Sequence, residues 1–497
     1  MREGAVMTDA LTPGTEEILL GQTALVAALD ALGAEHALAG AAGLCVTGAA
    51  LDSRVVKPGE IFFALPGAHV HGARFVAPAL AAGAVLAVVA RRDRELVDAR
   101  ADRTRIAWVE DAGAALTALG RAARAQARDL TVIAVTGSYG KTTTKEMIAA
   151  VLAASGPVHR TPGNFNNHLG VPVTLLGLTR RHRTAVIELG MNAPGEIAAL
   201  AALAAPQVGV LTGVGRAHLA GLGSRAAIMA AKLELASALG PEGRLILPAD
   251  DPELLQAART TGAHLLTVGV TPGSTADLRA TAIEVGAAGV CFLADGCGLD
   301  GLRIELAVPA RVLVTNALLA LAAGHLLGAP APAMAAALAS MRLPARRLNI
   351  VHAGGLVVVD DCYNANPESM AAALATLGDL AARRRIAVLG DMRELGAATP
   401  AAHAELGTRA AAVVDRLYVI GEEAETVARA ARAAGLAAAA ITVAPDRDAL
   451  IAGVTADLQA GDSILVKASR ALGLEVVVAA ILAAPLARGG APRRAGG

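Results

Sequence analysis

The stretch from residue 132 to residue 144 restricts the fold of this 497-residue chain more than any other. An apolar, β-branched run ends at Gly137, and the following turn closes with Gly-Lys-Thr-Thr before a helical pattern begins. This order predicts a buried strand, a loop whose backbone N–H groups bind phosphate, and a helix N-terminus carrying about half a unit of positive charge. Lys141 would reach the terminal phosphates of a nucleotide, and the Thr142 hydroxyl would bind Mg²⁺. The alternative is an ordinary strand–turn–helix corner.

The predicted loop is shorter than the usual P-loop, because Val135 stands where a first glycine is common. The remaining Gly-x-x-Gly-Lys-Thr form argues against the common GTPases and motor ATPases. The residues predicted to surround the phosphates are Gly137, Ser138, Tyr139, Gly140, Lys141, Thr142 and Thr143.

Composition argues against several classes of protein. Lys+Arg and Asp+Glu both number 44 and aromatic residues are 2%, so we expect no nucleic-acid partner. The longest apolar runs, 76–90 and 317–341, are interrupted by Gly, Pro or His, so we expect no membrane insertion. Asp9, Glu16 and Glu17 argue against a signal peptide. The four cysteines form no C-x-x-C pair and are expected to be reduced, mostly buried thiols of a cytoplasmic protein.

Length and the alternation of predicted elements indicate an α/β protein of three domains. We expect a small mixed α/β domain at 1–110, a central P-loop sheet at 111–341, and a second, mostly parallel, Rossmann-like sheet at 342–497. The central part includes an antiparallel excursion over 271–310, after which Pro330, Pro332 and Pro344 are expected to break the chain. The Gly/Pro/Arg-rich tail from about residue 488 is predicted to be disordered.

Polar residues follow other predicted strands of the central domain. Glu188 ends a strand at the carboxyl edge of the sheet, where ligands bind in open α/β folds, and is either a Mg²⁺ ligand or a helix-capping glutamate. His218 follows a further short strand and is a candidate metal or phosphate contact, with a structural role as the alternative. A nearby loop would recognise sugar or amide groups or form an ordinary turn, and its asparagines are Asn164, Asn166 and Asn167.

The flanking regions carry further candidates. Ser53 and Arg54 precede a Pro-Gly turn and would hold a diphosphate or form a surface turn with a salt bridge. Lys232 and Glu234 have the spacing of exposed charges on a helix. In the last domain, polar clusters follow three predicted strands and suggest a second ligand-facing edge. They contain Asp361, Asn364 and Asn366, then residues 390–395, then Lys467, Ser469 and Arg470.

Taken together, these motifs resemble the Mur ligases of peptidoglycan synthesis over about residues 40–480. The resemblance is carried by TGSYGKTTTKE, TPGNFNNHLGVPVTLL, AVIELGMNAPGEI, VVVDDCYNANPESM, VLGDMRELG and LVKASRALGLE. Within the family, it is greatest to the member that adds D-alanyl-D-alanine to UDP-N-acetylmuramoyl-tripeptide. The Asp-Asn-Pro-Arg motif of the sister ligase that adds a meso-diamino acid is absent from the sequence.

The resemblance implies a role for each domain. The first would bind the UDP end of the precursor through Ser53 and Arg54, the central one ATP and two Mg²⁺ ions, and the last would close over the site with the dipeptide. Thr142 and Glu188 resemble ligands of one Mg²⁺, and His218 resembles a contact in the second metal region. Lys232 falls where the family has a carbamylated lysine, whose negative charge would suit Mg²⁺ where an ammonium would be repelled.

Other residues take their expected roles from the resemblance alone. Asn316 resembles the residue that contacts adenine, and Arg346 resembles the hinge arginine that reaches the nucleotide phosphates. Asp361 resembles a nucleotide-side group of the closing domain. The remaining substrate-side residues are Asn164, Asn166, Asn167, Asn364, Asn366, Lys467, Ser469 and Arg470. The sequence departs from the family pattern at Tyr139, His71 and Ala468, and at residues 312–313.

The implied activity is ATP-dependent amide formation through an acyl phosphate, catalysed with Lys141, Lys232 and His218 by a cytoplasmic monomer. Two alternatives stay within amide ligases: a sister Mur ligase and a folylpolyglutamate-synthetase-like enzyme. Two others leave the class: a P-loop ATPase that forms no amide, and a binding homologue in which Tyr139 crowds the phosphates.

Overall fold

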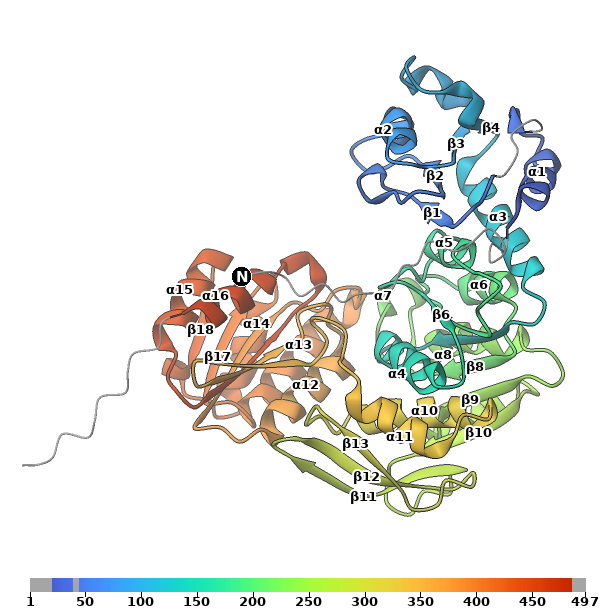
Figure 1. The fold of residues 1–497 in the computed structure, drawn as a ribbon. Helices are drawn as coiled ribbons and strands as arrows, with labels where there is room; N and C mark the ends of the chain where they lie inside the picture. The colour runs from blue at the N-terminus through green and yellow to red at the C-terminus, as the bar shows by residue number, and fades with distance from the viewer. Residues whose placement is uncertain (1–19, 39–43, 485–497) are drawn as a thin grey trace, which may run out of the picture.

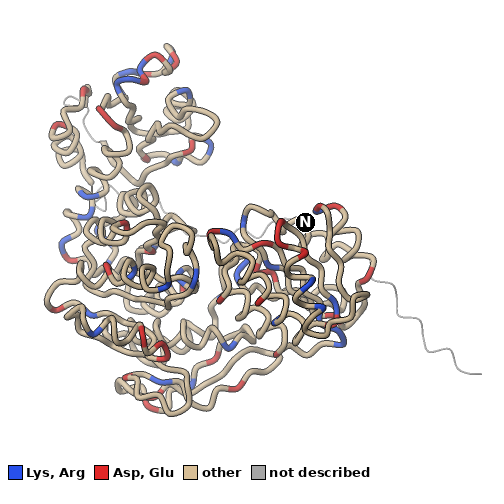
Figure 2. The backbone as a smooth tube through the Cα atoms, turned by 180° about the vertical axis from the view of Figure 1, so that it is seen from behind, with Lys and Arg blue, Asp and Glu red and all other residues tan. Residues whose placement is uncertain are grey.

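A computed structural model describes residues 20–38 and 44–484, which form three lobes, each built on its own sheet (Figure 1). Both Asp9 with its acidic neighbours and the tail from residue 488 lie outside the described residues. Within the described part, no helix combines the length and hydropathy needed to cross a membrane. Lys and Arg positions are intermixed with Asp and Glu positions over all three lobes (Figure 2).

The N-terminal lobe contains a parallel sheet in the order β1-β2-β3-β4. Leu25 of α1 and Leu116 of α3 pack on one face, and Val76 of α2 packs on the other. Both faces are therefore covered, as the apolar strand sequences require. The elements are α1 (Gln22–Ala31), β1 (Gly48–Ala50), η3 (Ser53–Val55), β2 (Glu60–Ala64), η4 (Gly72–Phe75), α2 (Val76–Ala81), β3 (Leu86–Ala90), η5 (Arg91–Leu96), η6 (Arg103–Arg105), β4 (Ile106–Val109) and α3 (Ala112–Gln126).

The central lobe contains a nine-stranded sheet in the order β13-β12-β11-β10-β9-β8-β5-β7-β6. Strands β5 to β11 all run parallel to one another. Strands β11, β12 and β13 pair in antiparallel fashion and form the antiparallel excursion expected over 271–310. The strands are β5 (Thr131–Thr136), β6 (Val158–Arg160), β7 (Thr184–Glu188), β8 (Val208–Leu211), β9 (Arg244–Pro248), β10 (His264–Gly269), β11 (Leu278–Gly286), β12 (Gly289–Asp295) and β13 (Leu302–Leu306).

Helices cover both faces of the central sheet. Met147 of α4 belongs to one core and Ile197 of α6 to the other, so the chain leaves neighbouring strands β5 and β7 toward opposite faces. Such a divergence opens a crevice at the carboxyl ends of the two strands. The helices are α4 (Lys141–Ala153), α5 (Gly170–Leu176), α6 (Glu196–Ala204), α7 (Leu219–Leu222), α8 (Arg225–Ser237), α9 (Pro252–Arg259), α10 (Leu313–Leu326) and α11 (Ala331–Ser340).

The C-terminal lobe contains a six-stranded sheet in the order β14-β15-β19-β16-β17-β18, parallel except for β14. Leu374 of α12 packs on one face and Ile481 of α16 on the other. Its elements are β14 (Asn349–Ala353), β15 (Leu356–Asp360), α12 (Pro367–Asp379), β16 (Arg384–Gly390), η7 (Gly396–Ala398), α13 (Thr399–Ala411), β17 (Arg416–Ile420), α14 (Ala424–Ala433), η8 (Ala438–Ala440), β18 (Ile441–Ala444), α15 (Arg447–Asp457), β19 (Asp462–Lys467), η9 (Arg470–Leu472) and α16 (Glu475–Ala483).

The structure corrects three expectations about the fold. Pro332 does not break the chain, because it lies in the first turn of α11, where a missing N–H is tolerated. The antiparallel strand β14 was not predicted from the sequence. The cysteines are not mostly buried, since only Cys362 is buried while Cys45, Cys291 and Cys297 are partly exposed.

Candidate functional site

The predicted strand, loop and helix are present as β5, residues 137–140 and α4. Gly137 has a φ of 151°, and a side chain there would collide with the Thr212 hydroxyl. Gly140 caps α4 with a φ of 74°, in the left-handed region that favours glycine. The two glycines therefore let the backbone pass close to β8 and turn directly into the helix, which directs free N–H groups toward one point.

Lys141 begins α4 and lines a cavity of about 680 Å³ between the central and C-terminal lobes. Its Nζ donates a hydrogen bond to the Gly137 carbonyl at 2.8 Å, which closes the loop on itself. Burial lowers the pKa of Lys141, the Glu188 charge opposes this shift, and the Arg347 charge adds to it. A bound polyanion would restore the full charge of this lysine.

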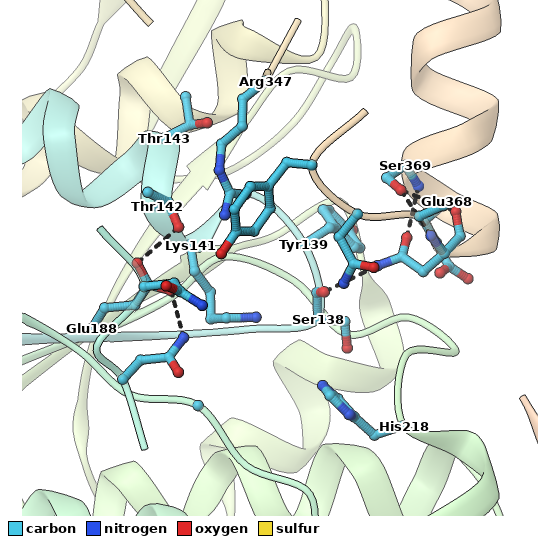
Figure 3. Close-up of a pocket in the computed structure, with 18 of the residues that line it drawn as sticks. Ser138, Tyr139, Lys141, Thr142, Thr143, Glu188, His218, Arg347, Glu368 and Ser369 are labelled. Carbon is cyan, nitrogen blue, oxygen red and sulfur yellow. Dashed lines mark hydrogen bonds between the residues drawn. The ribbon is translucent and has the colours of Figure 1, made fainter. Parts of the chain in front are cut away.

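Thr142 and Glu188 meet on the floor of the cavity (Figure 3). The Thr142 hydroxyl donates to Glu188 Oε2 at 2.8 Å, and Asn166 Nδ2 donates to Oε1 at 2.8 Å. Glu188 is 1% exposed and caps no helix, because the nearby N-terminus of α6 is capped by Glu234 instead. The alternative of a capping glutamate is therefore wrong.

The asparagine loop contributes to the same cavity, which Asn164, Asn166 and Asn167 all line. Asn167 also accepts bonds from the Leu169 and Gly170 N–H groups, so it has the ordinary turn role as well. The loop is fixed by Lys145, a buried residue that the sequence analysis did not single out. Lys145 Nζ donates to the Thr161 and Gly163 carbonyls at 2.7 and 2.9 Å.

His218 lines the cavity, whereas Lys232 lies outside its lining, near Lys141. His218 precedes α7 with a φ of 64°, lines the cavity, and pairs through Nδ1 with Glu394 of the C-terminal lobe at 2.6 Å. Lys232 lies on α8 and is 1% exposed, so the surface position that its spacing predicts is wrong. Burial and the neighbouring Lys141 charge hold the pKa of Lys232 well below its usual range. Among the described residues, none forms a hydrogen bond or ion pair with Lys232.

The C-terminal lobe supplies the opposite wall of the cavity. Buried Lys467 pairs with Asp361 at 2.6 Å and donates to the Asn364 carbonyl at 2.9 Å, and all three residues line the cavity. Asn366 caps α12 and donates to the Ser138 carbonyl at 3.2 Å, which links this lobe directly to the P-loop. Ser469 is outside the cavity lining and bonds to the Asp391 carbonyl.

The hinge places a different arginine at the cavity from the one the sequence analysis selected. Arg346 has a φ of 61°, pairs with Glu475 at 3.3 Å, and does not line the cavity. Arg347 does line it (Figure 3), and its guanidinium lies over the Tyr363 ring at 4.2 Å. Arg470 lies 5.2 Å from the same ring, so two cations contact this tyrosine, and Arg470 itself does not line the cavity.

Asn316 is buried on α10 and lies against Gly140, on the cavity wall formed with Val312 and Leu313. Tyr139 also lines the cavity, and its ring packs directly on Gly213. Its phenol therefore lies against β8, and burial and the Glu368 charge raise its pKa.

A second cavity of about 420 Å³ lies in the N-terminal lobe, between the ends of β2 and β3 and the start of α3, next to His168 and Leu169 of the central lobe. Arg92, Asp93 and Asp111 line it, and His168 lines both cavities. Ser53 and Arg54 line neither of the two cavities. The Arg54 side chain is 85% exposed and pairs with Asp52, which is the surface turn with a salt bridge that the sequence offered as the alternative. His71 pairs with Asp93 at 3.3 Å and caps η4.

The residues present fit a magnesium nucleotide better than a free metal ion. The described residues contain no group of three or more His, Cys, Asp or Glu side chains that would hold a metal alone. Thr142 and Glu188 nonetheless offer hard oxygen ligands next to a glycine loop, and phosphate oxygens would complete an octahedral set. Thr142 and Glu188 alone would give a Mg²⁺ ion only two protein ligands.

Three family models match the chain in succession. They are described as "Mur ligase family, catalytic domain" over residues 46–124, "Mur ligase middle domain" over residues 135–324, and "Mur ligase, glutamate ligase domain" over residues 346–470.

Individual relatives match along most of their length. A UDP-N-acetylmuramoyl-tripeptide–D-alanyl-D-alanine ligase of Mycobacterium tuberculosis H37Rv is 39% identical over 468 residues, covering 87% of this chain and 91% of the relative. The Escherichia coli K12 protein of the same name is 36% identical over 435 residues, with coverage of 86% and 92%. The solved structure of MurF ligase from Thermotoga maritima in complex with ADP has a TM-score of 0.75 and 29% identity, covering 88% of this chain and 97% of that chain.

Proposed function

Because this chain belongs to the Mur ligase family, we propose that it uses ATP to join D-alanyl-D-alanine to UDP-N-acetylmuramoyl-tripeptide in peptidoglycan precursor synthesis. The observation that carries this function is one cavity with two walls. The P-loop, Thr142 and Glu188 form the wall that suits a nucleotide, while Asp361, Asn364 and Lys467 face them from the closing lobe.

The bond-forming chemistry follows from bringing three reactants together. The terminal carboxylate of the tripeptide attacks the γ-phosphorus of ATP, the β–γ bridging bond breaks, and ADP leaves with its electron pair. The amine of the dipeptide then attacks the acyl carbon, loses a proton, and expels inorganic phosphate. Lys141 stabilises the negative charge on the transferring group, and Arg347 extends the same positive field from the hinge.

We assign metal positions to residues of the central lobe. Thr142 and Glu188 would hold one Mg²⁺, and His218 with a carbamylated Lys232 would hold a second. When bound, these ions would neutralise phosphate charge and orient the γ-phosphoryl group. Lys232 suits carbamylation because only a neutral amine attacks CO₂, and burial, which lowers the pKa of this lysine, favours the neutral form. A ¹³CO₂-dependent carbamate signal in NMR that disappears in Lys232→Ala would support this modification independently of activity.

The remaining substrate groups are assigned by position. Asn316 would contact the adenine, and Asn164, Asn166 and Asn167 would contact the tripeptide. The second cavity, joined to the first at His168, suits the nucleotide end of the precursor better than the exposed Arg54 does. Since ATP and a nucleotide-linked precursor are both substrates, we expect the enzyme to act in the cytoplasm. We also expect it to be a monomer.

The decisive experiment mixes the purified protein with ATP, Mg²⁺, the UDP-tripeptide and D-alanyl-D-alanine, and measures phosphate and amide together. We expect one amide for each phosphate, and no sustained phosphate release when either joining partner is omitted. Glu188→Gln keeps the shape of the side chain but removes its charge, and it should lose most of the turnover while retaining the fold. Replacing the dipeptide with single amino acids or the UDP-tripeptide with shorter precursors tests the sister ligases. Phosphate release without an amide would instead indicate a P-loop ATPase.

A further inference from the structure

Arg216 connects the central and C-terminal lobes beside the cavity, at a position to which no role has been assigned above. It lies in the loop after β8, two residues before His218. Its Nε donates to Glu368 Oε1 at 3.0 Å, and its backbone N–H donates to Glu368 Oε2 at 3.1 Å. A second arm, Nη1, donates to Glu405 Oε2 at 2.8 Å. One guanidinium therefore bridges the first turn of α12 and the middle of α13.

The same loop is hydrogen-bonded to the P-loop. Ser138 donates its backbone N–H to the Gly213 carbonyl at 2.9 Å, and its hydroxyl lies 3.5 Å from the Gly215 carbonyl. Glu368 packs directly on Gly215, where a side chain would collide with its carboxylate. Asn366 reaches back from α12 to the Ser138 carbonyl. The phosphate-binding loop, the Arg216 loop and the start of α12 thus form one continuous contact.

We propose that Arg216 is a positioning residue that docks the C-terminal lobe on the phosphate-binding edge and thereby protects the acyl phosphate from water. This inference rests on the proposed ligase function. An undocked lobe would leave the acyl carbon open to hydrolysis, in which water attacks that carbon, phosphate leaves, and the tripeptide carboxylate is regenerated. ATP would then be consumed without amide formation.

The surroundings of the pairs make the contact reversible. The side chains of Arg216, Glu368 and Glu405 are 34%, 26% and 36% exposed, so solvent and salt reach all three. Partly exposed ion pairs are screened as ionic strength rises, whereas a packed apolar contact is not. Docking by Arg216 is therefore expected to weaken in salt.

The test measures phosphate released per amide formed in the full-length protein, with ATP and both joining partners present. Arg216→Met keeps most of the side-chain volume and removes the charge, and we expect this ratio to rise roughly threefold to tenfold. Arg216→Lys keeps the charge but lacks the forked guanidinium that spans two carboxylates, so its ratio of phosphate to amide should lie between those of the wild type and Arg216→Met. The wild-type ratio should also rise with ionic strength, while that of Arg216→Met should change little.

Arg409→Met is the matched control. Arg409 bonds to the same Glu405 at 2.9 and 3.1 Å, but from within α13. The substitution therefore removes an equivalent charge without removing a contact between the lobes. It should keep the wild-type ratio. If Arg216→Met fails to fold, Glu405→Gln tests the same bridge from the other lobe.

An unchanged ratio and unchanged salt dependence in folded Arg216→Met or Glu405→Gln would overturn the proposal, as would an equal rise in Arg409→Met. Failure of the ligase function itself has a different signature, because the wild-type protein would then form no amide under any condition.

Discussion

Lys232 in the central lobe and Lys467 in the C-terminal lobe are both almost completely buried, yet the protein surrounds them in opposite ways. Lys467 ends β19 with Asp361 at 2.6 Å and a carbonyl at 2.9 Å, so its charge is balanced where it lies. Lys232 has no comparable partner among the described residues, and its neighbour Lys141 is another cation. Lys467 is therefore paired within the protein, whereas Lys232 has no such counter-charge until a ligand or modification supplies one.

Lys232→Ala gives the largest expected effect on activity. Amide formation should fall below detection, because the negative charge that we assign to the carbamate cannot form. Short carboxylic acids added to the variant should restore part of the activity by occupying the space of the carbamate. Full activity of Lys232→Ala without any additive, measured by amide formation, would remove the contrast between the two lysines.

Lys141→Ala should reduce turnover by roughly 10²–10³, as expected for removing one donor that stabilises developing charge. Its Nζ bonds only to the Gly137 carbonyl at the loop, so the thermal unfolding midpoint should change little. Steady-state phosphate release with both joining partners gives the rate. Turnover close to that of the wild type would argue against a role at the phosphates.

Lys467→Met tests the other side of the comparison through stability. Removing one partner of a buried pair leaves the Asp361 carboxylate uncompensated, which costs about 3–5 kcal/mol of unfolding free energy. Lys232→Met is the matched variant, and it should unfold at the same or a higher denaturant concentration, because an uncompensated buried amine is replaced by an apolar side chain. Equal losses in the two variants, measured by urea denaturation, would contradict the comparison.

The sequence predicted the strand, the glycine loop and the helix of residues 131–153 because their determinants are local. Gly137, Gly140 and the residues after them specify their own backbone conformation, and Glu188 follows directly from the end of its strand. The prediction for Lys232 is wrong because a charged residue at helical spacing is expected to be exposed, although Ile228 and Leu235, four residues before it and three after it, are buried on the same face of α8. Only the family resemblance suggested a functional role for that lysine.

Other errors concern residues whose surroundings depend on how distant parts of the chain fold together. Arg346 and Arg347 are adjacent at a hinge where Arg346 and Leu348 both have positive φ, so the sequence cannot tell which guanidinium turns toward the cavity. Lys145 resembles a surface charge one turn after Lys141 until the asparagine loop is folded over it. Arg216 and its partner Glu368 are 152 residues apart in sequence and meet only when the two lobes pack together. Long-range contacts of this kind have no local signature.

Acid sensitivity is the smallest expected difference between the two lobes. His159 on β6 lies 4.9 Å from the His182 ring and bonds to the Thr174 carbonyl at 2.7 Å. Burial, reinforced by the His182 charge, lowers the pKa of His159 from 6.5 to about 4. The unfolded chain therefore binds more protons than the folded one between these values, so stability should fall as the pH drops from about 6.5 to about 4 and level off below.

His159→Gln retains an amide donor for Thr174 but cannot titrate, and its unfolding free energy should depend less on pH over that window. The matched variant His352→Gln replaces an exposed histidine of the C-terminal sheet, far from the His159 cluster, and should keep the wild-type slope. Equal slopes for His159→Gln and the wild type in urea titrations would show that the acid sensitivity lies elsewhere.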